Sequence, residues 1–292
     1  MSLAIETHGL TRNFGDFCAV DEIELRVEAG TFYGFLGPNG AGKSTTIKML
    51  TGLLAPSKGT MRLLGENPLD RKAAIGIKQR IGVVSEDLAL FDYLKAREYL
   101  MFIGRMFGVD RDTIEDRTDQ LLTLLRMDDV DKKLILEYSH GMKKKVALAA
   151  ALLPDPELLF LDEPFEGVDA VTSAAIREVL SSFVSRGSTV FLTSHVLSIV
   201  EQLCTHVGII SHGELVEQTS LDELRQGSSL EAVFLEKVGS SEEAMQTLSW
   251  LGGDANSSSA EPMEIDFGES IAEVAESHDD PNAASDSSQE PS

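Results

Sequence analysis

The chain has 292 residues, 42% of them hydrophobic, which is enough to bury a sizeable core as one large domain or as one domain with an appendage. Its 48 acidic and 25 basic side chains give a formal net charge of −23. Nucleic-acid binding by neutralisation of backbone phosphates needs a basic face, so this balance argues against such a partner and against a generally basic membrane-binding patch.

Cysteine usage and hydropathy indicate a protein of the reducing cytosol. Cys18 and Cys204 lie far apart in the sequence, so neither a disulfide framework nor a zinc cluster is expected. The start of the chain lacks a basic segment followed by an apolar one, and the aliphatic run at 146–153 is much shorter than the ~20 residues of a membrane span. If the protein works at a membrane, we expect another chain to anchor it.

Short β-rich runs alternate with helical segments along most of the chain. Continuous apolar strands separated by helices predict an α/β fold with a mainly parallel sheet covered on both sides, and with an antiparallel part near the start. The predicted strands are 22–27, 31–37, 60–65, 80–86, 157–163, 188–194 and 206–211.

The segment GPNGAGKST follows the strand FYGFL and opens a predicted helix at 44–54. It matches G-x-x-x-x-G-K-[ST], a pattern whose backbone N–H groups and helix N-terminus surround the β- and γ-phosphates of a nucleotide. We expect Lys43 to reach the terminal phosphates and Ser44 to ligate Mg²⁺. A chance glycine turn is the alternative, which the flanking strand and helix argue against. The predicted loop comprises Gly37, Pro38, Asn39, Gly40, Ala41, Gly42, Lys43, Ser44 and Thr45.

Between the predicted strands at 80–86 and 157–163 the alternation stops. Segments 94–108, 112–127 and 142–153 have helical spacing with no strand between them. This pattern predicts an inserted helical subdomain at about 87–155.

Three polar side chains follow buried strands, at the edge where open α/β sheets bind ligands. Asp162 and Glu163 end the run LLFL; Asp162 suits Mg²⁺, directly or through water, and Glu163 suits a base or polarising group for an attacking water. His195 ends the next strand, where it could touch a γ-phosphate or that water. Solvated acids and a structural histidine are the plainer alternatives, and only the combination with Lys43 argues against them.

The end of the chain changes in composition. SLEAVFLEKV at 229–238 predicts a last helix packed on the core, whereas Val238 to Ser292 contains 13 Asp and Glu and no Lys or Arg. The Ser-, Asp-, Glu- and Pro-rich part cannot bury enough apolar surface to offset its ordering entropy. We therefore predict a nucleotide-binding domain at 1–238 and an acidic, Ser-rich, disordered tail at 239–292.

In their order and gaps, these motifs resemble the ATP-binding-cassette (ABC) family over about residues 3–227. The motifs are GPNGAGKS, VVSED, YSHGMKKKVALAAALL directly before LLFLDEP, FEGVD and LTSH. The resemblance implies a P-loop NTPase fold and an Mg²⁺-dependent ATPase in which two nucleotide-binding domains close head to tail on two ATP molecules. Each ATP then lies between the phosphate-binding loop of one chain and the signature helix of the other.

The family's signature loop most often reads Leu-Ser-Gly-Gly-Gln, and here residues 138–142 read Tyr-Ser-His-Gly-Met. Ser139 is placed to cap the next helix and to offer its hydroxyl to the partner's γ-phosphate, and Gly141 permits close backbone approach. Because His140 replaces a usual glycine, the turn must avoid glycine-only dihedral angles.

Three further positions take their roles from the resemblance. Phe14 lies where the family stacks an aromatic ring on adenine, with a core phenylalanine as the alternative. Glu86 replaces a usual glutamine that faces Mg²⁺ or the attacking water; a carboxylate keeps an acceptor oxygen but cannot donate a hydrogen bond as an amide does. Asp169 matches the family's dimer-contact loop.

The resemblance extends to the exporter branch whose cassette and membrane subunits are separate chains. It implies a cytoplasmic subunit, peripheral on the membrane, that couples ATP hydrolysis to integral membrane permease subunits. Exposed Phe91, Tyr93 and Leu94 would dock the permease, with the core of the helical subdomain as the alternative for each.

Two other functions stay open. A soluble cassette protein acting on ribosomes or DNA typically has a second cassette or a long coiled-coil insertion, and the sequence contains neither a second GxxxxGK[ST] nor sustained heptads. A binding module without turnover would be expected to lack Glu163 or Lys43, and both are present.

Overall fold

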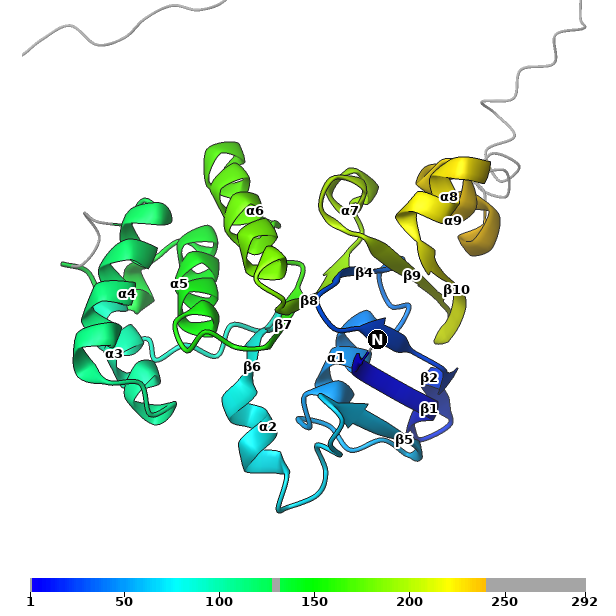
Figure 1. Ribbon diagram of the computed structural model, residues 1–292, viewed down its shortest axis with the longest axis horizontal. Helices are drawn as coiled ribbons and strands as arrows, with labels where there is room; N and C mark the ends of the chain where they lie inside the picture. The colour runs from blue at the N-terminus through cyan, green and yellow to red at the C-terminus, as the bar shows by residue number, and fades with distance from the viewer. Residues whose placement is uncertain (1, 128–131, 240–292) are drawn as a thin grey trace, which may run out of the picture. The chain divides into compact units, whose positions relative to one another are not determined.

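The computed structural model describes residues 2–127 and 132–239, which form two sheets and the helices around them (Figure 1). The larger sheet has the strand order β10-β9-β4-β8-β7-β6, and β10 alone runs antiparallel to its neighbour. Its strands are β4 (Phe32–Leu36), β6 (Ile81–Val84), β7 (Leu158–Asp162), β8 (Thr189–Ser194), β9 (His206–Ser211) and β10 (Glu214–Ser220).

A smaller antiparallel sheet is built on the long first strand. β1 (Leu3–Phe14) pairs with β2 (Phe17–Ile23), β3 (Arg26–Glu28) and β5 (Lys58–Leu63). A mainly parallel sheet with an antiparallel part near the start is therefore confirmed.

The prediction of one continuous strand at 22–27 is wrong. Glu22 has φ 44°, and the chain leaves β2 after Ile23 to pair with a different part of β1. At the break the Thr7 hydroxyl accepts a hydrogen bond from Leu25 N–H at 2.7 Å and donates one to Ile23 O at 2.8 Å. The Thr7 side chain thus takes the place of a neighbouring strand as the hydrogen-bond partner of these backbone groups. A hydrophobic pattern does not reveal such an exchange.

The helices follow the strands on both sides of the larger sheet. Among the described residues none has the length and apolarity that crossing a bilayer requires. The helices are α1 (Lys43–Leu50), α2 (Ala74–Arg80), α3 (Ala96–Met106), α4 (Arg111–Leu124), the 3₁₀-helix η2 (Ile135–Glu137), α5 (His140–Leu152), α6 (Ala170–Ser185), α7 (Leu197–Leu203), α8 (Leu221–Gly227) and α9 (Leu230–Val238). The sequence did not individually predict strands β1 and β10, most of β2, or helices α2, η2, α6, α7 and α8.

Alternate side chains of the parallel strands enter two different cores, which explains why these strands are apolar on both faces. On β8, Val190 and Leu192 pack with the helical side of the molecule, and Phe191 between them packs toward α1 and the antiparallel sheet. Phe191 stacks on Tyr33 with ring centroids 5.5 Å apart. The two covered faces hold the parallel sheet between α1 on one side and α5, α6 and α7 on the other.

Helices α3, α4 and α5 lie together, at the left of Figure 1, with no strand between them in the described chain. Gly104 of α3 lets α4 approach closely, because a Cβ there would lie 2.6 Å from Ile114 Cγ1. The predicted α/β fold with an inserted helical subdomain is confirmed. Its exact limits, about 87–155, stay a prediction.

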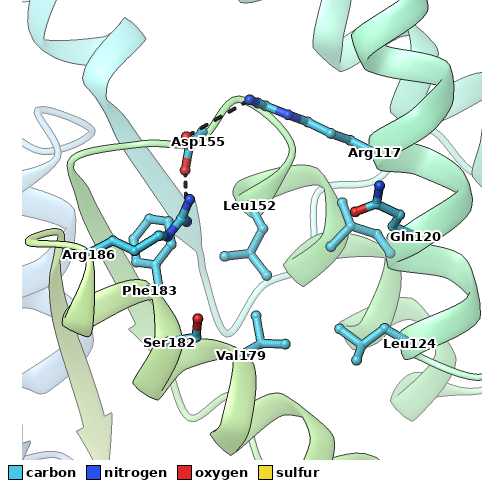
Figure 2. A pocket seen from close by; sticks show the side chains of 10 residues that line it. Arg117, Gln120, Leu124, Leu152, Asp155, Val179, Ser182, Phe183 and Arg186 are labelled. Atoms are coloured by element: carbon cyan, nitrogen blue, oxygen red, sulfur yellow. Dashed lines mark hydrogen bonds and ion pairs between the residues drawn. The ribbon is translucent and has the colours of Figure 1, made fainter.

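A pocket of about 370 Å³ marks the junction of α4, α5 and α6 (Figure 2). Asp155 lies between two arginines there, 3.1 Å from Arg186 Nη2 and 3.9 Å from Arg117 Nη2. Arg117 also donates to Leu153 O at 2.7 Å. These contacts join the helical subdomain to the sheet-bearing part of the chain.

The last described helix, α9, packs through buried Leu230 on the core, as predicted for 229–238. Ser229 caps it by accepting a hydrogen bond from Ala232 N–H at 3.1 Å. Apart from Gly239, the predicted tail at 239–292 lies outside the described residues.

Candidate functional site

The carboxyl ends of four parallel strands meet at one edge of the larger sheet. Leu36 of β4 pairs with Ser194 of β8, and Asp162 of β7 pairs with Thr193 beside it. Val84 of β6 pairs with Leu161, so the loops after β4, β6, β7 and β8 all emerge together. Ligands bind at this edge in open parallel sheets.

The loop at 37–42 depends on glycine at defined positions. Gly42 has φ 109°, and a Cβ there would lie 2.6 Å from Ala19 O. At Gly37 a Cβ would lie 2.4 Å from Ile210 O. The chain can therefore turn tightly from β4 into α1. The N-cap of α1 is Gly42, which provides no side-chain cap, so the first N–H groups of the helix are suited to an anion.

Lys43 is the buried cation of this loop, with only 7% of its side chain exposed. Its Nζ donates to Gly37 O at 2.7 Å and to Pro38 O at 3.2 Å. It also lies 3.7 Å from Glu163 Oε1. The ammonium of Lys43 thus lies near the carboxylate of Glu163, the residue that follows β7.

Glu163 is held in an uncommon backbone conformation, φ 48°. Its N–H donates to Thr193 Oγ1 at 3.1 Å, and the Thr193 hydroxyl donates to Asp162 Oδ1 at 2.5 Å. Its Oε2 lies 3.0 Å from His195 Nδ1. Its Oε1 is buried and has no hydrogen-bond partner among the described residues. Strain and unpaired polar atoms of this kind cluster at functional sites.

The side chains of Lys43, Glu163 and His195 line a pocket of about 520 Å³. Of the predicted site residues, Gly37, Pro38, Ala41, Asp162, Ser139 and Gly141 do not line it. Phe17, Ala19 and Glu166 do and were not predicted, although Phe17 belongs to the same RNFGDF turn as Phe14 and exposed aromatic rings of a turn are a usable signal. The predicted residues on the pocket are Phe14, Asn39, Gly40, Gly42, Lys43, Ser44, Thr45, Glu86, Glu163 and His195.

Phe14 is 48% exposed, which excludes a core position. The Arg12 guanidinium lies 4.6 Å from the centroid of its ring. Phe17 beside it is 64% exposed. Both exposed rings line the pocket, where a flat ligand can stack on an aromatic face.

The predicted metal residues lie on two sides of the loop. Glu86 Oε2 accepts a hydrogen bond from Ser44 Oγ at 3.3 Å. Asp162 is only 2% exposed and is held by Thr193 behind the pocket. Ser44 and Glu86 therefore meet directly on the pocket, whereas Asp162, at the end of β7, does not line it.

The signature loop is at the start of α5. Ser139 is the N-cap, as predicted, and accepts a hydrogen bond from Met142 N–H at 3.3 Å. His140 is the first helical residue and has no positive φ, also as predicted. Gly141 permits a close approach within the chain, because a Cβ there would lie 2.4 Å from Gly167 O.

Asp169 acts within its own chain as the N-cap of α6. It accepts hydrogen bonds from Thr172 N–H at 2.9 Å and Thr172 Oγ1 at 2.7 Å, and it lies 3.3 Å from Lys145 Nζ. The Thr172 N–H and hydroxyl, followed by Lys145, hold the pKa of Asp169 well below its usual range. The loop between β7 and α6 is thereby attached to the signature helix.

Residues 20–166 match the family model described as ABC transporter. The chain is 40% identical over 227 residues to the bacitracin transport ATP-binding protein BcrA of Bacillus licheniformis, covering 77% of this chain and 72% of that one. It is 35% identical over 248 residues to the daunorubicin/doxorubicin resistance ATP-binding protein DrrA of Streptomyces peucetius, covering 84% and 74%. A solved ATP-binding subunit of an ABC transporter superimposes with a TM-score of 0.75 at 28% identity, covering 80% of this chain and 99% of that one.

A phosphate-binding loop, a carboxylate at the end of β7 and a signature helix therefore occur here in a chain that shares sequence and fold with known cassettes. The chain belongs to the ABC transporter family, as an ATP-binding subunit with ATPase function.

Proposed function

We propose that this ATPase drives an exporter whose permease subunits are separate chains, and that it works at the cytoplasmic face of the membrane. The named relatives act in bacitracin transport and in daunorubicin/doxorubicin resistance, which supports a transported substrate. The observation that carries the hydrolytic role is the Glu163 carboxylate, placed between Lys43 and His195 with its buried Oε1 lacking a hydrogen-bond partner among the described residues.

In this proposal, some residues bind ATP and others activate the attacking water. The backbone N–H groups of residues 39–45 and the Lys43 ammonium bind the β- and γ-phosphates, and Phe14 stacks on the adenine. The free oxygen of Glu163 orients the attacking water and accepts its proton. His195 hydrogen-bonds the other carboxylate oxygen and so fixes the direction in which Glu163 points.

The chemistry of Ser44, Glu86 and Asp162 also fits Mg²⁺, since this ion takes a few hydroxyl or carboxylate oxygens and completes its octahedron with phosphate and water. When bound, Mg²⁺ neutralises charge that develops on the transferred phosphoryl group. Ser44 and Glu86 would hold it on the pocket side, and Asp162 would hold it directly or through water.

Changing Glu86 to Gln tests the metal assignment. Gln keeps one acceptor oxygen but removes a negative charge, so we expect the Mg²⁺ concentration for half-maximal nucleotide binding to rise by about 3- to 10-fold. A fluorescent ATP analogue titrated with Mg²⁺ measures this concentration without turnover. Asp87→Asn is the control, because Asp87 is 90% exposed beside it. An unchanged Mg²⁺ dependence in Glu86→Gln would remove Glu86 from the metal site.

The proposed active unit contains a second nucleotide-binding domain. Ser139 and Gly141 do not line the pocket of their own chain, whereas the first N–H groups of α5 and the Ser139 hydroxyl are suited to a γ-phosphate. We assign them to the ATP bound by the partner. Each site would then be completed only when two chains close together.

A groove of about 420 Å³ is the proposed docking site for a permease segment. It lies between the sheet-bearing part and the helical subdomain, and its apolar lining includes Leu53, Val83, Leu88, Leu90, Ile103 and Phe107. The chain that leaves the groove exposes Phe91 and Tyr93, by 52% and 81%. Leu94 instead packs on the core, so the alternative weighed for it from the sequence holds.

Changing Tyr93 to Ser tests the docking site and the exporter proposal together. Exposed aromatic residues are frequent hot spots, so we expect at least 10-fold less permease to copurify from detergent-solubilised membranes, with ATP affinity unchanged. Leu235→Ser, which removes a 43% exposed apolar side chain from α9, is the control. A ribosomal or DNA partner copurifying with the parent chain would refute the proposed function.

A further inference from the structure

The signature helix carries a buried lysine that the proposed mechanism does not use. The Lys144 side chain is 2% exposed, and its Nζ donates to the main-chain oxygen of Glu163 at 2.8 Å and to Glu166 Oε2 at 3.1 Å. Burial strips an ammonium of its hydration, a loss that hydrogen bonds and a counter-charge must offset. Glu166 is 57% exposed, and the shorter of the two hydrogen bonds goes to the Glu163 carbonyl, so this carbonyl is the less exposed acceptor of the charge.

The peptide groups on both sides of Glu163 are fixed by neighbouring elements. Its N–H is held by Thr193 of β8 and its C=O by Lys144 of α5. Between these two anchors the residue keeps φ 48°, a conformation that a residue with a side chain does not favour on its own. The direction of the carboxylate, between Lys43 and His195, follows from this backbone conformation.

We propose that Lys144 is a positioning residue for Glu163, which holds the carboxylate in its productive direction and links it to the signature helix of the same chain. The inference rests on the proposed role of Glu163 in hydrolysis and goes beyond it. It assigns to α5 a function at the ATP of its own chain, in addition to the function of Ser139 at the ATP of the partner.

Contacts on both sides of Lys144 hold α5 against the loop after β7. Gly141 lies against Gly167, Lys144 against Glu166 and Lys145 against Asp169. The hydrogen bond from Lys144 lowers the pKa of Glu166, which favours the ionised carboxylate. A movement of the α5 N-terminus toward a partner's nucleotide would therefore be transmitted to Glu163.

Lys144→Met is the direct test, because it preserves length and burial but removes the donor. Misplacement of a reacting group by about 1 Å can cost about 100-fold, so we expect kcat to fall by about 10- to 100-fold, with the Kd for ATP changed less than about twofold. Lys144→Gln can donate to the Glu163 carbonyl and is expected to recover kcat to within about fivefold of the parent. Lys143→Met is the matched control, since Lys143 points to Asp92, 2.9 Å away, and should keep the parental kcat.

A double-mutant cycle separates positioning from a purely structural effect. In a Glu163→Gln background the carboxylate to be positioned is gone, so adding Lys144→Met should change the single-turnover rate by less than about twofold and leave the ATP-dependent dimer intact. A structural defect would instead weaken ATP binding and the dimer in both backgrounds.

Three results would overturn the proposal: parental kcat in Lys144→Met, equal loss of ATP affinity and kcat, or an additive effect in the double variant. If Lys144→Met does not fold, Lys144→Gln is decisive: a kcat within about fivefold of the parent with an unchanged Kd for ATP supports the proposal, and a larger loss of kcat despite the retained donor overturns it. Failure of the proposed function is distinct, because the parent would then lack turnover or Glu163→Gln would hydrolyse ATP normally.

Discussion

Replacing Glu163 with Gln is expected to abolish steady-state ATP hydrolysis while leaving ATP binding intact. The amide cannot accept the proton of the attacking water, and loss of a general base costs about 10²- to 10⁴-fold in rate. The side chain keeps its length, so the Lys43 and His195 sides of the pocket lose little packing. ATP that binds without being hydrolysed should accumulate a closed dimer. Radiolabelled phosphate release measures turnover, and size-exclusion chromatography with and without ATP measures the dimer.

The control for this charge change is Glu178→Gln on the exposed side of α6. It should hydrolyse ATP at the parental rate and form no trapped dimer. Near-parental hydrolysis by Glu163→Gln would show that the carboxylate does not activate water.

Replacing Lys43 with Ala is expected to weaken ATP binding by about 100-fold or more. Hydrogen bonds to charged groups contribute about 1.5–3 kcal/mol each, and a lysine at this position can make two of them with phosphate oxygens. The substitution also leaves the buried oxygen of Glu163 without its nearby cation, so negative charge in the pocket would oppose the phosphates. Titration with a fluorescent ATP analogue measures the affinity.

Lys48→Ala on the last turn of α1 is the matched control. Lys48 is 42% exposed and pairs only loosely with Asp87, at 3.5 Å, so ATP affinity and thermal stability should remain close to those of the parent. A Lys43→Ala protein that is folded and binds ATP within threefold of the parent would exclude Lys43 from the phosphate site.

Much of the fold could be predicted because its cause is local. The strand at 206–211 has the predicted bounds, and α5 begins two residues before its predicted start because Ser139 caps it. Hydrophobic patterns failed to predict strands where the strand depends on a partner far away in sequence. The break at Ile23 depends on Thr7, and strand β10 pairs with β9 although its side chains are largely part-exposed and polar.

The residues of the candidate site also divide into those that a local sequence pattern predicts and those that it does not. The loop 37–45, the acids at 162–163 and His195 were found because their chemistry follows directly from residue type and from the strand that precedes them. Glu166 and Lys144 were not found, because nothing near them in sequence indicates that a helix 19 residues upstream donates to the Glu163 carbonyl.

By itself the sequence determined the family and located the phosphate-binding loop, since motifs of contiguous residues carry both, and it predicted which groups serve as base and as metal ligands. Only the tertiary structure decided how these groups are arranged: that Glu163 Oε1 is buried near Lys43 without a hydrogen-bond partner among the described residues, that Phe14 is exposed beside Phe17, and that Lys144 donates to the Glu163 backbone. The physical reason is that direction and burial of a side chain depend on elements that meet only in the folded chain, because the register of parallel strands and the packing of α5 bring distant residues to one edge of the sheet.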